Sequence, residues 1–202
     1  MTDSPREIRY ERVRQSILDA AHRLITTEGA DNVSMRGIAR EVDYTVGALY
    51  KYFESKEVLL ATICEVGFER LVETMHHTFK PEDPFTERLY SCGQGYIQFA
   101  RDNPEVYMLM FNQIQADPNA LFGTVESNAF GVIYGLVQEG IKSGLIAPRE
   151  AYTPQAIAFQ LWYVVHGIAS LRLTVFNGMD EDFDRMNDQV LRAAVHQVVN
   201  QT

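Results

Sequence analysis

Apolar residues along the chain recur three and four positions apart, which is the spacing of amphipathic helices. A first apolar face runs from Ile17 to Ile25 and predicts a helix over about residues 11–27 that ends at Gly29. No alternation of the kind that predicts strands stands out. We therefore expect an all-α protein of about nine helices, with a three-helix N-terminal domain followed by a larger helical bundle.

Helix starts are marked by residues that favour the N-cap position. In four places the cap candidate precedes a proline, whose missing N–H costs nothing in the first turn: Asp83-Pro84, Asn103-Pro104, Asp117-Pro118 and Thr153-Pro154. Further cap candidates are Ser34, Thr45 and Ser55. A last apolar stripe predicts a helix over about residues 181–200.

Two short helices are predicted close together, over residues 34–41 and 45–52. Only Val42, Asp43 and Tyr44 separate them, and short helices joined by such a turn form a helix-turn-helix. In that motif the second helix enters the DNA major groove by its N-terminal end. Leu49 and Phe53 are expected in the core. The candidate DNA contacts are Ser34, Arg36, Tyr44, Thr45, Val46, Gly47, Ala48, Tyr50, Lys51, Tyr52 and Lys56.

Three stretches of this region resemble the TetR family of transcriptional regulators. They read VSMRGIA from Val33, TVGALYKYF from Thr45 and SKEVL from Ser55. The resemblance implies a homodimer that reads a palindrome and a C-terminal domain that binds a small molecule which alters DNA affinity. The residues that match the family's helix cap, recognition-helix glycine and two phosphate contacts are Thr45, Gly47, Tyr50 and Lys56.

One position departs from the family's pattern, which usually has glycine in the turn. Here the residue is Asp43. Because aspartate tolerates left-handed backbone better than most residues, the turn is still expected to form. Tyr44 beside it is larger than the usual small aliphatic residue and is expected to reach the DNA backbone.

Charge is distributed unevenly along the chain, whose formal net charge is −9. Residues 1–60 hold nine Lys and Arg against ten Asp and Glu, and the remainder holds nine against seventeen. The basic stretch at the N-terminus contains Arg6, Arg9, Arg12 and Arg14. Phosphate binding depends on the local patch rather than on the whole chain, so the acidic total does not exclude DNA.

A DNA-binding domain is expected over residues 9–58 and a regulatory domain over residues 59–202. The segment from Trp162 to Gly167 resembles the Trp-x-x-x-His-Gly segment of one TetR subgroup, although packing in the core also explains these residues. The bulky aromatic side chains of this domain could line a pocket for an apolar or aromatic effector. The alternative is that they pack in an ordinary core. The candidate ligand-binding residues are Phe99, Tyr107, Phe111, Phe130, Tyr134, Trp162 and His166.

The segment over residues 156–176 is almost continuously apolar, but Arg172 interrupts it. We expect no membrane span there, and instead a helix buried by its own domain and by a second copy. Candidate dimer contacts are Phe159, Tyr163, Val190 and Ala194. Cys64 and Cys92 show no metal-ligand spacing and are expected to be reduced core residues of a cytoplasmic protein.

An enzyme and a helical interaction module are the two alternative classes of function. Glu73 and His76 have the helical spacing of carboxylate di-iron bundles, but no second such motif occurs in the sequence. No hydrolase elbow or phosphate loop is found, so no catalytic residue, metal or cofactor is expected. A helical interaction module without DNA is disfavoured by the two capped short helices. Repression is favoured by family habit alone, and activation stays open.

Overall fold

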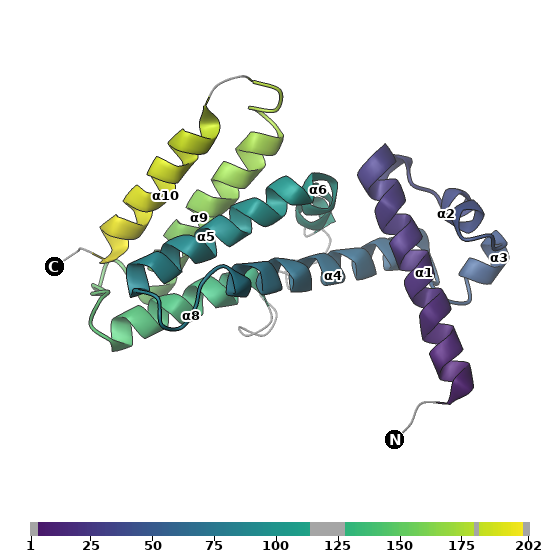
Figure 1. The fold of residues 1–202 in the computed structure, drawn as a ribbon, viewed down its shortest axis with the longest axis horizontal. Coiled ribbons are helices and arrows are strands. Elements are labelled where there is room, and N and C mark those ends of the chain that lie inside the picture. The colour runs from purple at the N-terminus through teal and green to yellow at the C-terminus, as the bar shows by residue number, and fades with distance from the viewer. Residues whose placement is uncertain (1–3, 114–127, 180–181, 200–202) are drawn as a thin grey trace. The chain divides into compact units, whose positions relative to one another are not determined.

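A computed structural model describes residues 4–113, 128–179 and 182–199. The nine α-helices in these residues are α1 (Pro5–Glu28), α2 (Met35–Glu41), α3 (Val46–Leu49), α4 (Lys56–His77), α5 (Phe85–Asp102), α6 (Pro104–Gln113), α8 (Ala129–Lys142), α9 (Pro154–Leu173) and α10 (Phe183–Val199). A short 3₁₀ turn, η1 (Ala30–Asn32), follows α1. No strand occurs in the described residues, so the predicted all-α class is confirmed (Figure 1).

The chain forms two compact units. The first unit comprises Met1–Gly67 and Asn103–Gln113, and the second comprises Phe68–Asp102 and Ile114–Thr202. Helix α4 begins in the first unit and ends in the second, while α6 belongs to the first unit although it follows α5. The functional division into residues 9–58 and 59–202 stays a prediction.

The first unit is built around α1. Its inward face holds Ile17 and Ile25, as the apolar spacing predicted, and these side chains are fully buried. Helices α2 and α6 both pack against α1. Leu49 and Phe53 are buried as expected, so the segment that begins at α3 is anchored to the core at both positions.

Helix α1 begins earlier than predicted, at Pro5 instead of about residue 11. Ser4 and Glu7 form a capping box: the Ser4 hydroxyl accepts from the Glu7 N–H, and the Ser4 N–H donates to the Glu7 carboxylate. These hydrogen bonds hold the pKa of Glu7 below its usual value. The arginine-rich stretch is therefore the first part of a helix.

The second unit is a bundle in which α5, α8, α9 and α10 pack together (Figure 1). Thr153 caps α9 through the Ala156 N–H, and Pro154 occupies its first turn, as predicted. Helix α8, capped by Asn128, was not predicted. The helix start predicted at Asp117-Pro118 lies outside the described residues.

Helix α9 is long and apolar enough to cross a membrane by length and composition, a test that core helices of soluble proteins also pass. It packs against α5, α8 and α10 through a face that includes Leu161 and Val165.

Burial raises the pKa of the Cys64 thiol to about 11 and that of Cys92 to about 12. Both are free and buried, so their predicted place in the core is confirmed.

Candidate functional site

The turn between α2 and α3 has the backbone that the sequence required of it. Asp43 has a φ of 57°, the only positive φ at a non-glycine residue in the described parts of the chain. The Tyr44 N–H donates to the Ala39 carbonyl over 2.9 Å, which closes the C-terminus of α2 as in a Schellman motif. The expectation that aspartate can replace the usual glycine here is thus confirmed.

The segment from Thr45 to Phe53, called here the recognition segment, starts with a helix cap. The Thr45 hydroxyl accepts from the Ala48 N–H over 3.2 Å. Helix α3 ends at Leu49, so the predicted helix over residues 45–52 was too long. The chain continues as a hydrogen-bonded turn because the N–H groups of Tyr52 and Phe53 both donate to the Leu49 carbonyl. Ser34 caps α2 in the same way, accepting from the Gly37 N–H.

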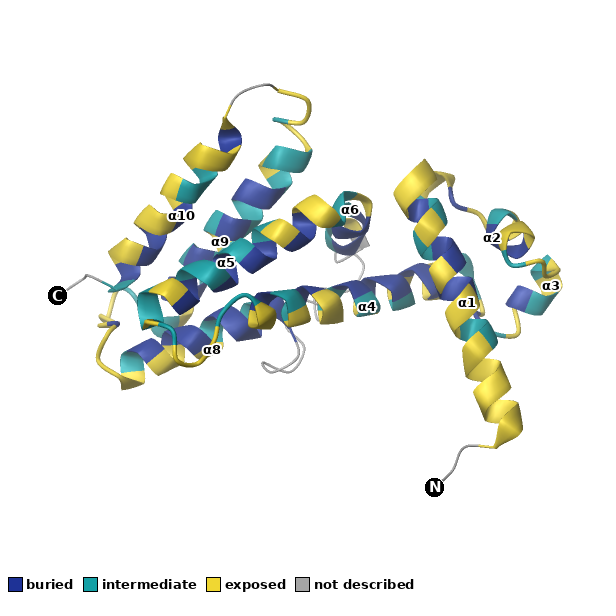
Figure 2. Ribbon diagram, viewed as in Figure 1, coloured by how far each residue is buried: buried dark blue, intermediate teal, exposed yellow. Residues whose placement is uncertain are grey.

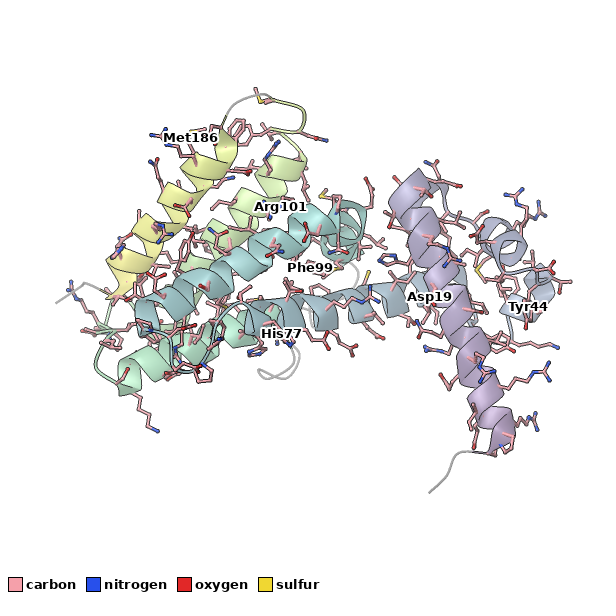
Figure 3. The ribbon with its side chains drawn as sticks, in the orientation of Figure 1. Asp19, Tyr44, His77, Phe99, Arg101 and Met186 are labelled. Carbon is pink, nitrogen blue, oxygen red and sulfur yellow. The ribbon has the colours of Figure 1, made fainter. Side chains whose placement is uncertain are left out.

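The predicted DNA contacts divide into exposed and half-buried groups. The exposed residues are Ser34, Arg36, Tyr44, Thr45, Gly47, Tyr50 and Lys51, and the half-buried ones are Val46, Ala48, Tyr52 and Lys56. Tyr44 lies beside α3 (Figure 3). A Cβ added at Gly47 would meet no atom within 4 Å, so the backbone there is open to an approaching surface.

Helix α1 contributes to this surface in a way the sequence did not predict. The rings of Tyr10 and Tyr52 stack with their centroids 4.8 Å apart, and Arg14 lies 5.0 Å from the centre of the Phe53 ring. These contacts join the first part of α1 to the turn after α3. Tyr10 was missed because the predicted helix began after it.

The predicted ligand-binding residues are split between the units. Tyr107 and Phe111 lie on α6 in the first unit, with ring centroids 4.7 Å apart. The other five residues lie in the second unit, and Phe99 is buried there on α5. The remaining four belong to a run of aromatic rings along α8 and α9: Phe130, Tyr134, Phe159, Trp162, Tyr163 and His166.

His166 is held by hydrogen bonds on both ring nitrogens. Its Nδ1 lies 3.0 Å from the Tyr96 hydroxyl, and its Nε2 lies 3.3 Å from the Ser170 hydroxyl. Burial lowers the pKa of His166, so the neutral ring is favoured at pH 7. The Trp162 ring packs beside it, as the four-residue spacing predicted. This environment favours the packing interpretation of the pair.

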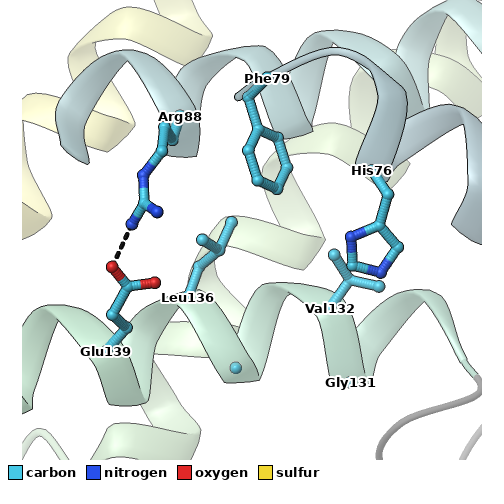
Figure 4. A pocket seen from close by; sticks show the side chains of 8 residues that line it. His76, Phe79, Arg88, Gly131, Val132, Leu136 and Glu139 are labelled. Carbon is cyan, nitrogen blue, oxygen red and sulfur yellow. Dashed lines mark hydrogen bonds and ion pairs between the residues drawn. The ribbon is translucent and has the colours of Figure 1, made fainter. Parts of the chain in front are cut away.

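A cavity of about 410 Å³ lies in the second unit. It is lined by His76, Phe79, Arg88, Gly131, Val132, Gly135, Leu136 and Glu139 (Figure 4). None of the seven predicted ligand-binding residues is among them. This cavity was not predicted because its walls come from α5, from α8 and from the end of α4 with the residues just after it, and only the tertiary fold brings them together.

The predicted dimer residues differ in exposure. Tyr163 on α9 is 63% exposed and Val190 on α10 is 50% exposed, whereas Ala194 is only 6% exposed. Figure 2 shows α10 with one buried side and one exposed side. Gln160 of α9 donates to Gln197 of α10 over 3.2 Å, which joins the outer faces of the two helices. Ala194 therefore packs inside the protomer.

Comparisons with known proteins also point to a transcriptional regulator. The chain matches the family model of bacterial regulatory proteins of the tetR family over residues 17–63, and that of the tetracyclin repressor-like C-terminal domain over residues 89–194. An HTH-type transcriptional regulator of Haemophilus influenzae is 28% identical over 52% of this chain and 56% of its own length. Another from Mycobacterium bovis is 22% identical over 73% of this chain and 65% of its own length. The chain thus spans less than two thirds of these curated relatives.

Solved structures resemble most of the chain. A protein of unknown function from Rhodococcus sp. RHA1 has a TM-score of 0.74 and 25% identity, covering 93% of both chains. The TetR-family regulator PfmR from Thermus thermophilus has a TM-score of 0.63 and 18% identity, covering 91% of this chain and 97% of its own. The second likeness concerns the fold alone.

Proposed function

The chain belongs to the TetR family of bacterial regulatory proteins, and on that premise we propose that it is a cytoplasmic, homodimeric repressor that binds a palindromic operator and is released by a small-molecule effector. Regulators of this family bind DNA. The observation that carries the proposal is the capped segment from Thr45 to Phe53, which is anchored by its buried residues while Gly47 stands in open space.

The DNA-facing roles follow from exposure and chemistry. The Lys51 and Lys56 ammonium groups and the Tyr44 and Tyr50 hydroxyls suit phosphate oxygens, which position the protein on the duplex without reading sequence. Arg36 and Ser34 at the start of α2 are assigned to the sugar-phosphate backbone of the DNA as well. Val46 and Ala48 carry only apolar side chains, so their readout is limited to thymine methyl groups.

The dimer is proposed to form through α9 and α10. Tyr163, Gly167 and Leu171 are spaced four residues apart on the outer face of α9, and a Cβ at Gly167 would meet no atom within 4 Å. On α10, Met186 and Val190 are exposed on one side of the helix. Two copies of this surface would make a four-helix seam, and stable seams bury about 1,200 Å² or more.

Control by an effector is proposed to act through α4, which is covalently continuous from Lys56 in the first unit to His77 in the second. A ligand bound in the second unit would shift this helix and so change the register of the two DNA-reading segments. Because phosphate contacts fix that register, a small shift lowers DNA affinity. Coupling of this kind is typically about 5–150-fold in affinity.

Replacing Lys56 by alanine tests the assigned phosphate contact. The Lys56→Ala dimer should bind all DNA sequences more weakly, and the slope of log K against log salt should become shallower by about one unit, because one fewer counterion is released. Fluorescence anisotropy across a salt series measures the slope. Lys80→Ala, which removes the same charge from a loop of the second unit, is the control and should leave it unchanged. A changed base preference with an unchanged slope would contradict the assignment.

A further inference from the structure

Arg88 is the charged residue that stands out in the second unit, because it is only 8% exposed. Its Nη2 donates to the Glu139 carboxylate, which links α5 to α8. Its guanidinium carbon lies 5.7 Å from the centre of the Phe85 ring. The Arg88 Nε is the one buried side-chain nitrogen or oxygen without a hydrogen-bond partner among the described residues. A buried donor without an acceptor destabilises the fold, so a partner from outside the chain would be favoured there.

The cavity beside Arg88 has apolar walls between two polar ends. Phe79, Val132 and Leu136 separate the Arg88–Glu139 pair from His76 (Figure 4). The lining residues of α8 follow helical spacing on one face, and a Cβ added at Gly135 on that face would meet no atom within 4 Å. The volume of about 410 Å³ lies within the range of small-molecule sites.

The charges around the cavity favour a ligand whose hydrogen-bond acceptor is neutral over one whose acceptor is an anion. Glu139 already balances the charge of Arg88, and the Glu139 side chain is 50% exposed at the edge of the site. A ligand carboxylate would therefore place a second negative charge beside Glu139, and like charges at short range oppose one another. A neutral acceptor, such as a ketone or ester oxygen, meets the Arg88 Nε without this repulsion.

We propose that this cavity binds a neutral, largely apolar molecule whose carbonyl oxygen accepts a hydrogen bond from the Arg88 Nε, with its apolar body against Phe79, Val132 and Leu136. As a binding site the cavity stands on its own geometry. As the site of the effector that releases DNA, it rests on the proposed function.

Three probes of matched size test the ligand class on the full-length protein. They are 2-acetylnaphthalene, which has a neutral acceptor, 2-naphthoate, which is an anion, and 2-ethylnaphthalene, which has no acceptor. Isothermal titration calorimetry should show the ketone binding at least about tenfold more tightly than either of the others, because only it satisfies the buried donor without added charge. Equal affinity of the ketone and the hydrocarbon, or tighter binding of the carboxylate, would overturn the proposal.

Substitutions at both ends of the pair sharpen this test. Arg88→Met keeps an extended apolar side chain without the donor, so the ketone should lose its advantage while the hydrocarbon keeps its affinity. Glu139→Gln leaves Arg88 without a countercharge, so 2-naphthoate should gain at least about tenfold relative to the ketone. If Arg88 only ties α5 to α8, neither substitution changes the order of the three affinities.

A cavity-filling substitution keeps the proposal testable should Arg88→Met fail to fold. Gly135→Leu places a side chain in the open space of the cavity, and Gly135→Ala is the matched control that changes helix propensity with little loss of volume. The leucine variant should keep its melting temperature and lose at least about tenfold in affinity for the ketone, whereas the alanine variant should lose less. Undiminished ketone binding by Gly135→Leu would place the ligand elsewhere and overturn the proposal.

Measuring DNA binding in parallel separates this inference from the proposed function. Probe binding that follows Arg88 and Gly135 supports the site, whether or not the ketone weakens DNA binding. If the ketone binds free protein and DNA complex equally, the cavity is not a release switch, because linkage is reciprocal. If the protein binds DNA but the ketone has no preference for the cavity, the site inference alone fails.

Discussion

Replacing Gly47 with glutamate should abolish sequence-specific DNA binding while leaving the protein folded and dimeric. The new side chain would extend into open space, so it meets no obstacle within the first unit. On the DNA-facing end of α3 it would place a negative charge against phosphates at close range. We expect a loss of at least about 1,000-fold in operator affinity, the lower end of the gap between specific and non-specific binding.

Two variants separate charge at the interface from other causes. Gly47→Ala adds only a methyl group in the same open space and should weaken binding much less. Thr26→Glu adds the same charge at an exposed position near the C-terminal end of α1, and should leave DNA binding unchanged. Gel-shift titrations and circular dichroism measure affinity and folding. If Gly47→Glu binds the operator with an affinity within tenfold of wild type, α3 does not contact the DNA.

Replacing Val190 with glutamate should convert the dimer into a folded monomer of 23.0 kDa. Val190 is half-exposed on α10, so the charge is solvated in the monomer, but it would be unpaired and buried in a seam between two copies. Since each half-site contact is made by one subunit, the monomer should also lose affinity for the palindrome. Light scattering at micromolar concentration measures the mass.

The position of the charge around α10 provides the control. Arg185→Glu changes the charge by more than Val190→Glu does, but on an exposed part of the helix away from Met186 and Val190, and should leave the dimer intact. Ala194→Glu should instead lower the melting temperature, because Ala194 is packed inside the protomer. A dimeric Val190→Glu variant would show that the seam lies elsewhere.

Local signals in the sequence predicted the elements that depend on neighbouring residues. The caps at Ser34, Thr45 and Thr153 were identified because a side-chain oxygen reaches an N–H three residues ahead. The left-handed turn at Asp43 was anticipated from the same kind of local argument. The start of α1 was misplaced although Ser4 and Glu7 carry the capping-box signature, because the apolar face begins only at Ile17.

Features that depend on tertiary packing were not predictable in this way. Val190 and Ala194 belong to one apolar stripe in the sequence, yet the bundle buries Ala194 and leaves Val190 exposed. The cavity beside Arg88 escaped notice for a similar reason. Arg88 and Glu139 are 51 residues apart, and each alone looks like an ordinary surface charge on an amphipathic helix.

As a dimer, this chain should bind a two-fold symmetric DNA sequence. The deciding measurement is selection of bound fragments from a random DNA pool by the full-length protein. We expect a palindromic consensus whose half-site centres are about 34–36 Å apart, or a multiple of that distance, because each subunit presents one recognition segment to the major groove. A consensus with a single unrepeated half-site, or no enrichment over the starting pool, would rule out binding by a symmetric dimer.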